Sequence, residues 1–170
     1  MAQIPKIKAK AEIESSPAKV FDFFKYKLKQ FPNIYSQVFK KLESLEGEER
    51  IQQGLAPTIF SYGIFLGGQK TIYPKLCVWI CTCQSNQTMT AKVRTEAVNE
   101  GEKSVTFKTI EGDVMQIYTT FITKVTVGDG YVIWTIEYEK ANDTAPIPDN
   151  YTTLAAEITK GLDAYLLSQI

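Results

Sequence analysis

The order of elements at the end of this chain constrains its fold more than any other feature of the sequence. Five alternating segments between Leu76 and Lys140 contain no credible helix, and one long amphipathic segment, Asn150 to Gln169, closes the chain. This order predicts an α+β fold, in which an antiparallel sheet carries a single helix across one face. The covered face would be apolar and rich in aromatic side chains. A void between helix and sheet would suit a hydrophobic small molecule.

Alternation of apolar and polar residues defines the expected strands, because successive side chains of a strand point to opposite faces. The segment Lys6 to Glu14 alternates cleanly and predicts a strand with one solvated face. The ranges predicted as strands are 6–14, 39–45, 76–82, 89–97, 104–110, 114–127 and 131–140. Side chains expected to point inward are Met89, Ala91, Val93, Thr95, Val105, Phe107, Ile117, Thr119, Phe121, Thr123, Val125, Val132, Trp134, Ile136 and Tyr138.

Two short helices are expected after the first strand. Ser15-Ser16-Pro17 predicts a helix start with a serine N-cap and proline in the first turn, and this helix runs to about Lys27. A second short helix is expected over Asn33 to Val38, after the break at Phe31-Pro32. In the closing helix, the apolar residues recur at helical spacing and form a broad stripe. They are Tyr151, Leu154, Ala155, Ile158, Leu162, Tyr165 and Leu166.

The stretch from Arg50 to Tyr73 fits no regular pattern. It contains Gly54, Pro57, Gly63 and the pair Gly67-Gly68, with large apolar residues between them. It is either a hairpin or a long loop with an apolar tip. A structureless loop of this length is unusual inside a compact domain, so we expect a lid or an added element. We treat the chain as a single ligand-binding domain, 1–170, with an inserted segment at about 48–70.

Charge and composition exclude several classes of function. Basic and acidic residues balance at 19 each, which argues against nucleic-acid binding. No apolar run approaches the roughly 18 residues of a membrane span, and the first residues lack the apolar region of a secretory signal. We therefore expect a cytoplasmic protein, monomeric or weakly dimeric. The three Asn-x-Thr sequons are then expected to be unused; they lie at Asn86, Asn142 and Asn150.

The chain has no histidine, which removes the usual general base of serine and cysteine nucleophiles and the most common metal ligand. Cys77, Cys81 and Cys83 share one face of a strand. A zinc site would need a fourth ligand that the pattern does not supply, so we favour core thiols. No phosphate or dinucleotide motif is present, and we expect no cofactor and no metal.

Two peptides and the closing segment carry a family resemblance. The peptides are Glu111-Gly112-Asp113-Val114-Met115 and Trp134-Thr135-Ile136-Glu137-Tyr138-Glu139-Lys140. With Ser16-Pro17-Ala18 and the segment Pro146 to Leu167, this ordered combination resembles the major latex proteins. That group is a plant branch of the superfamily of birch-pollen allergens and pathogenesis-related class-ten proteins.

The resemblance implies a START-like helix-grip fold. A seven-stranded antiparallel sheet would wrap around the long C-terminal helix, with two short helices after the first strand. It also implies a cavity between sheet and helix for hydrophobic ligands such as sterols, lipids, terpenoids and phenolics, with roles in defence or specialised metabolism. The sequence departs from the family pattern after the second strand, where about twenty residues are added. The family's glycine-rich loop corresponds either to Glu46-Gly47-Glu48, with the addition after it, or to Gly67-Gly68, with the addition before it.

Three hypotheses follow for the function. The first is a carrier of a hydrophobic metabolite; the second is a cofactor-independent cyclase or isomerase of iridoid or alkaloid type; the third is an interaction module similar to the hormone-receptor branch. A buried lysine or carboxylate facing the cavity would favour the enzyme, and an apolar cavity with hydroxyl groups would favour the carrier. The residues expected to contact the ligand are Tyr26, Phe31, Val93, Phe107, Thr119, Phe121, Thr123, Trp134, Tyr138, Leu154, Ile158 and Leu162. No catalytic residue is assigned.

Overall fold

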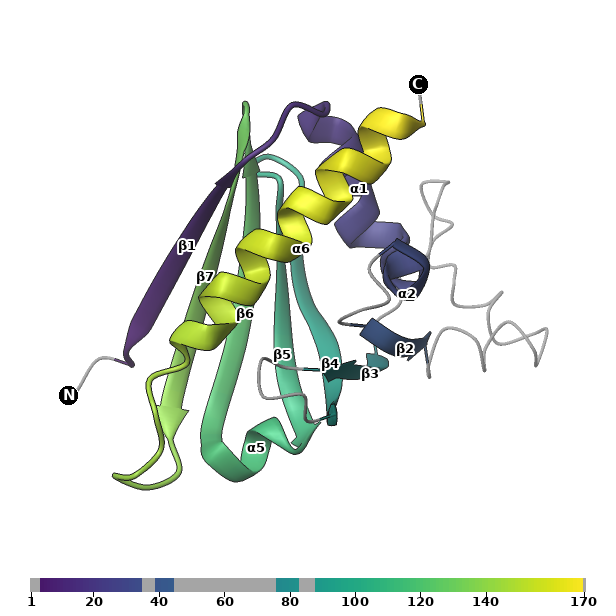
Figure 1. The fold of residues 1–170 in the computed structure, drawn as a ribbon. Coiled ribbons are helices and arrows are strands. Elements are labelled where there is room, and N and C mark those ends of the chain that lie inside the picture. Colours follow the sequence, from purple (N-terminus) through teal and green to yellow (C-terminus); the bar gives the residue numbers. More distant parts are fainter. Residues whose placement is uncertain (1–3, 35–38, 45–75, 83–87, 170) are drawn as a thin grey trace, which may run out of the picture.

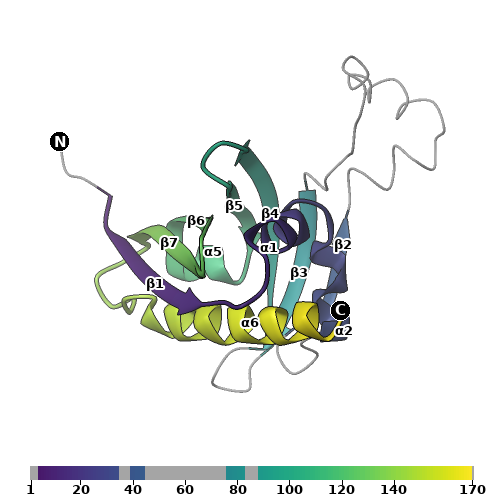
Figure 2. The same ribbon diagram turned by 90° about the horizontal axis from the view of Figure 1, so that it is seen from above.

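The computed structural model describes residues 4–34, 39–44, 76–82 and 88–169. Their strands form one seven-stranded antiparallel sheet in the order β1-β7-β6-β5-β4-β3-β2. The long helix α6 (Asp149–Ser168) lies across the open side of this curved sheet (Figures 1 and 2). The α+β helix-grip architecture expected from the sequence is therefore confirmed. The proposed insertion at 48–70 lies outside the described residues.

The two edge strands of the sheet are β1 and β2. Strand β1 (Lys6–Glu12) pairs with β7 (Tyr131–Lys140), placing Ala9 opposite Trp134. At the other edge β2 (Phe39–Ser44) pairs with β3 (Leu76–Thr82), which pairs with β4 (Thr88–Asn99). The side chains of β2 and β3, including Cys77 and Cys81, are outside what the structure describes, and so is all of Cys83.

Helix α1 (Pro17–Tyr26) begins as the sequence predicts, with proline at its first position and Ser16 at the N-cap. The Ser16 side chain makes no capping hydrogen bond. The helix buries Val20, Phe23 and Phe24, and a short 3-10 turn η1 (Leu28–Gln30) follows it. In the views of Figures 1 and 2 the two short helices lie near the C-terminal end of α6.

The second helix begins earlier than expected. Helix α2 spans Phe31–Ile34, so Phe31 and Pro32 lie inside its first turn and the predicted start at Asn33 is wrong. Proline is tolerated there because first-turn amides have no partner within the helix. Phe31 is fully buried against Phe23, with the ring centroids 4.8 Å apart. Residues 35–38 of the predicted helix lie outside the described ranges.

A one-turn helix interrupts the segment that alternation assigned to a single strand. Helix α5 (Val114–Ile117) precedes β6 (Tyr118–Gly128), and the pairing of β6 with β7 shifts register between Tyr118 and Thr120. Such an irregularity reverses which residues face inward on either side of it. Tyr118 is therefore buried and Thr119 is exposed. The prediction of a continuous strand from Val114 is wrong.

The Glu111-Gly112-Asp113 peptide has a structural explanation, because its glycine ends β5 (Ser104–Gly112) against β4. Gly112 has φ +116°, and a Cβ there would lie 2.3 Å from the carbonyl oxygen of Thr90. Asp113 then holds the same residue from both sides: its amide donates to the Thr90 carbonyl at 2.9 Å, and its carboxylate accepts from the Thr90 amide at 2.8 Å. These two hydrogen bonds fix the start of α5 and therefore the position of Val114.

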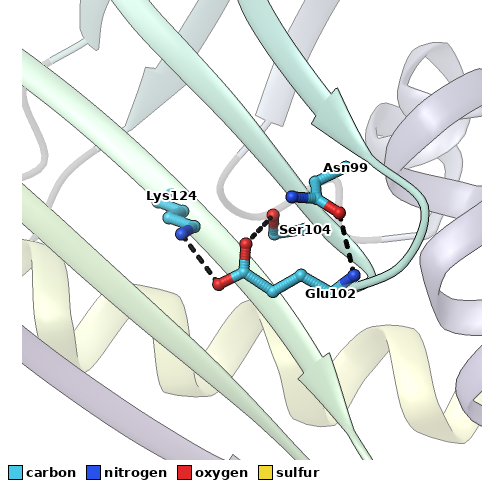
Figure 3. A network of polar contacts seen from close by, with 4 residues as sticks. All are labelled: Asn99, Glu102, Ser104 and Lys124. Carbon is cyan, nitrogen blue, oxygen red and sulfur yellow. Dashed lines mark hydrogen bonds and ion pairs between the residues drawn. The ribbon is translucent and has the colours of Figure 1, made fainter.

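The β4–β5 turn carries its own polar network, drawn in Figure 3. Asn99 Oδ1 accepts from the amide of Glu102 at 2.9 Å, and the Glu102 carboxylate accepts from Ser104 Oγ at 3.0 Å and from Lys124 Nζ at 2.9 Å. The hydrogen bonds from Lys124 and Ser104 hold the pKa of Glu102 below its usual value. The turn also contacts α1, since Glu100 forms an ion pair with Lys25.

Candidate ligand-binding pocket

A pocket lies between the inner face of strands β4 to β7 and the first half of α6. Its position follows from alternation on the strands and helical spacing on α6, which send the two sets of side chains toward each other. Helix α5 adds one residue at the end of the pocket. The lining residues are Ala91, Val93, Phe107, Thr109, Val114, Phe121, Thr123, Trp134, Ile136, Tyr151, Leu154, Ala155 and Ile158.

The pocket is small but open. Its cavity volume is about 90 Å³, and the space between atoms reaches about 710 Å³ when the part open to solvent is included. One water molecule needs roughly 10–15 Å³ on the smaller measure, so the cavity holds several waters or one small guest. A larger guest would have to extend through the open side or displace side chains of the wall.

The wall is nearly all apolar. Four aromatic residues, Phe107, Phe121, Trp134 and Tyr151, provide most of the large surfaces. Among the described lining residues, hydroxyl groups come from Thr109, Thr123 and Tyr151, and Trp134 adds an indole N–H that is already bonded to Thr159. No aspartate, glutamate, lysine or arginine is among the lining residues described. Such a wall favours an uncharged guest, because burying an unpaired charge is costly.

Seven of the twelve residues expected to contact a ligand line this pocket. They are Val93, Phe107, Phe121, Thr123, Trp134, Leu154 and Ile158. Four others lie elsewhere in the interior or at its edge: Phe31 packs in the aromatic cluster of α1 and α2, and Leu162 is buried further along α6. Tyr138 packs on Tyr118 with centroids 5.9 Å apart, and Tyr26 is half-buried beside Lys25.

Thr119 is the remaining residue, and the expectation that it faces inward is wrong. It is exposed to solvent, because the irregular pairing of β6 with β7 changes which side chains point inward before Phe121. Alternation counted from Thr123 backwards cannot detect a bulge. The residue that takes the inward position is Tyr118, which is 1% exposed and donates its hydroxyl to the carbonyl of Pro146 at 2.9 Å.

Six lining residues were missing from the sequence-based set: Ala91, Thr109, Val114, Ile136, Tyr151 and Ala155. Alternation or helical spacing had already placed Ala91, Ile136, Tyr151 and Ala155 on the inner face, but not at the cavity. Thr109 continues the inward series of Val105 and Phe107, so its signal was present. Val114 reaches the pocket only because α5 forms, and alternation gave no sign of that helix.

A buried hydrogen bond fixes α6 over the pocket. Trp134 Nε1 donates to Thr159 Oγ1 at 2.8 Å, and the Thr159 hydroxyl donates to the Ala155 carbonyl at 2.8 Å. Trp134 is 6% exposed and Thr159 is completely buried. The indole also meets the ring of Phe24 edge-on, with centroids 5.5 Å apart. This tryptophan therefore joins sheet, closing helix and α1 at the side of the cavity.

A second polar contact attaches α6 to the turn between β1 and α1. The Asp163 carboxylate accepts from the amide of Ser15 at 2.8 Å, from the amide of Glu14 and from the Ser15 hydroxyl. Burial alone would raise the pKa of Asp163, but these hydrogen bonds more than offset it and the pKa lies below its usual value. The carboxylate is therefore ionised and structural at neutral pH.

Other buried titratable groups also lie away from the pocket wall. Burial, with smaller effects from Tyr138 and Asp149, raises the pKa of Tyr118 to about 12. Burial would lower the pKa of Lys25, but its hydrogen bonds and charge interactions with Glu100 and Tyr26 raise it above the usual value. Neither group is in a state to exchange protons at neutral pH.

Metal-binding clusters and membrane-spanning helices are both absent from the part of the chain that the structure describes. That part contains no group of three or more cysteine, aspartate or glutamate side chains arranged to hold a metal ion. Its helices include none with the length and apolar character needed to cross a bilayer.

Comparisons with known proteins agree with this architecture. The model of the pathogenesis-related protein Bet v 1 family matches residues 74–169. MLP-like protein 34 of Arabidopsis thaliana is 38% identical over 85 residues, which cover 46% of this chain and 27% of the relative. Alignments to four such Arabidopsis relatives span 25% to 53% of their own lengths. Major latex protein 146 of Papaver somniferum is 21% identical over 169 residues, 96% of this chain and 91% of the relative.

Among solved structures, ginseng major latex-like protein 151 from Panax ginseng superimposes with a TM-score of 0.77. It is 23% identical, and the match covers 98% of this chain and 99% of the ginseng protein. The fold and pocket thus define a helix-grip protein with an apolar pocket between its sheet and its closing helix. Within that class the chain belongs to the Bet v 1 family, in its major latex protein branch.

Proposed function

We propose that this protein binds an uncharged hydrophobic small molecule, such as a terpenoid, sterol, lipid or phenolic, in the pocket under α6. The supporting observation is the wall itself, which joins aromatic and aliphatic surfaces to three hydroxyls. Each 100 Å² of apolar surface that a guest buries contributes about 2.5 kcal/mol to its transfer from water. We place the protein in the cytoplasm, as a monomer or weak dimer, with a role in plant defence or specialised metabolism.

The alternative of a cofactor-independent cyclase or isomerase is not favoured by this pocket. Proton transfer needs an acid or base within hydrogen-bond reach of the substrate, with a pKa near the working pH. The buried lysine of the described interior is Lys25, which lies on α1 in an ion pair with Glu100 rather than in the pocket wall. Among the described lining residues, Tyr151 is the one with an ionisable proton. Carriage of a ligand requires none of these groups.

The proposal is tested by filling the pocket from α6. Ile158→Trp inserts a larger side chain at a lining position that is 5% exposed, whereas Glu157→Trp places the same side chain at an exposed neighbour. Native mass spectrometry with a panel of terpenoids, sterols and phenolics should show retention by the wild type and by Glu157→Trp, and loss by Ile158→Trp. Retention of no panel member by the wild type would contradict the carrier function. Equal binding by Ile158→Trp would show that the guest lies elsewhere.

A further inference from the structure

One polar side chain in the pocket wall lacks the hydrogen bond that its burial requires. Thr109 on β5 is 6% exposed and lines the cavity. Its hydroxyl has no hydrogen-bond partner among the residues that the structure describes. Trp134 and Thr159, buried beside the same cavity, are by contrast bonded to each other. Buried hydroxyls in proteins are nearly always paired with protein or water, so the Thr109 hydroxyl takes its partner from the pocket, and a guest that displaces pocket water has to replace that hydrogen bond.

A second hydroxyl lies close to the first on the same wall. Thr123 on the neighbouring strand β6 also lines the pocket, is part-buried, and has no side-chain hydrogen bond within the described residues. It is paired across the sheet with Phe107, two residues before Thr109, so the two threonines are diagonal neighbours. Their Cα atoms are then expected roughly 7–8 Å apart. Both hydroxyls therefore belong to the sheet side of the pocket, whereas Tyr151 lies on α6.

We propose that Thr109, assisted by Thr123, determines ligand specificity by hydrogen-bonding an uncharged oxygen of the guest, a hydroxyl or a carbonyl, held against strands β5 and β6. This inference rests on the proposed ligand-binding function. A threonine hydroxyl both donates and accepts, so it suits either group. A carboxylate is excluded from the same position, because no lysine or arginine among the described lining residues would compensate its charge.

The probes are 2-naphthol, 2-methylnaphthalene and 2-naphthoate, which share a ring system and differ in one substituent. Binding is followed by quenching of Trp134 fluorescence in a Trp79→Phe background, so that one tryptophan emits. The measured quantity is the ratio of the 2-naphthol and 2-methylnaphthalene affinities. The free energy of each probe in water is the same for every protein variant. It therefore cancels when the affinity ratios of two variants are compared.

Thr109→Val keeps the shape of the side chain and removes the hydroxyl. It should shift the affinity ratio against 2-naphthol by about 2- to 12-fold, the contribution of one net hydrogen bond. Thr109→Ser retains the hydroxyl and should keep the wild-type ratio. Thr106→Val, on the opposite face of β5, is the matched control and should also leave the ratio unchanged. 2-Naphthoate should bind the wild type at least tenfold more weakly than either neutral probe.

The outcomes separate this inference from the function on which it rests. Tight binding of 2-methylnaphthalene with an unchanged ratio in Thr109→Val would overturn the specificity role and leave ligand binding intact. A shift caused by Thr123→Val alone would assign the contact to β6 and reject Thr109. Binding of 2-naphthoate as strong as that of 2-naphthol would reject the uncharged class. Failure of the wild type to bind either neutral probe would overturn the specificity inference, and the native mass spectrometry panel would then decide the ligand-binding function separately.

Discussion

The hydrogen bond between Trp134 and Thr159 offers the sharpest test of how α6 is held on the sheet. Thr159→Val preserves side-chain volume and removes the acceptor oxygen. The indole N–H of Trp134 is then left buried without a partner, at a cost of about 1–3 kcal/mol in the free energy of unfolding. Valine and threonine have similar helix propensities, so the backbone of α6 contributes little to this difference.

The loss is measured by urea unfolding followed by circular dichroism. For a chain of 170 residues it corresponds to a fall in melting temperature of roughly 2–12 °C. A double-mutant cycle isolates the bond, since Trp134→Phe removes the donor. In that background Thr159→Val leaves no orphaned N–H and should change the free energy of unfolding by less than about 0.5 kcal/mol. An equal loss in both backgrounds would refute the assignment of the stabilisation to this bond.

Three further predictions concern contacts around the sheet. Gly112→Ala should lower the free energy of unfolding in urea by more than about 2 kcal/mol, because its Cβ would clash with the backbone of Thr90. Gly130 also has a positive φ, but nothing lies within 4 Å of the point where its Cβ would be, so Gly130→Ala should cost only about 1 kcal/mol. Equal losses in the two variants would reject the steric explanation. The pKa of Asp163 is lowered on folding, so its stabilisation is complete above the unfolded value and is lost as the pH falls through the folded value. The advantage of wild type over Asp163→Asn, about 1.5 kcal/mol at pH 7, should therefore shrink below about pH 4, and an advantage independent of pH would contradict this. Glu100→Gln should destabilise more than Lys25→Met, because only the former leaves the buried Lys25 ammonium without its carboxylate partner. The reverse order in thermal melts would reject the importance of this ion pair.

Regular periodicity explains why the main walls of the pocket were predictable. Alternation on β7 placed Trp134 and Ile136 correctly, and the helical spacing of α6 placed Leu154 and Ile158. These patterns survive folding because a buried face must be apolar at every repeat of its element. Sequence reasoning failed where geometry departs from the repeat, as it does at the pairing shift before Phe121.

The sequence also did not reveal where along a helix or strand a residue would have to lie to line the pocket. Leu162 and Phe31 are apolar and face the interior, as expected. They nevertheless belong to the close-packed part of the core to which α1 and α2 contribute, and not to the pocket wall. Which part of an apolar interior stays open depends on the summed side-chain volumes of several elements, and a single chain pattern does not encode that sum. The hydrogen bond between Thr159 and Trp134 could not be predicted for a similar reason. A single threonine in an apolar stripe does not indicate which distant side chain it contacts.

The two polar anchors of α6 explain why the cavity lies under its first half. Thr159 is bonded to the sheet and Asp163 to the turn before α1, so the second half of the helix is fixed at two successive turns. The pocket-lining residues of α6, from Tyr151 to Ile158, all precede these anchors. Side chains beyond Thr159, such as Leu162 and Leu166, pack closely because the helix is held down there. A guest can therefore be accommodated where α6 is supported mainly by apolar contacts, which adapt to a new neighbour at lower cost than a bonded carboxylate or indole.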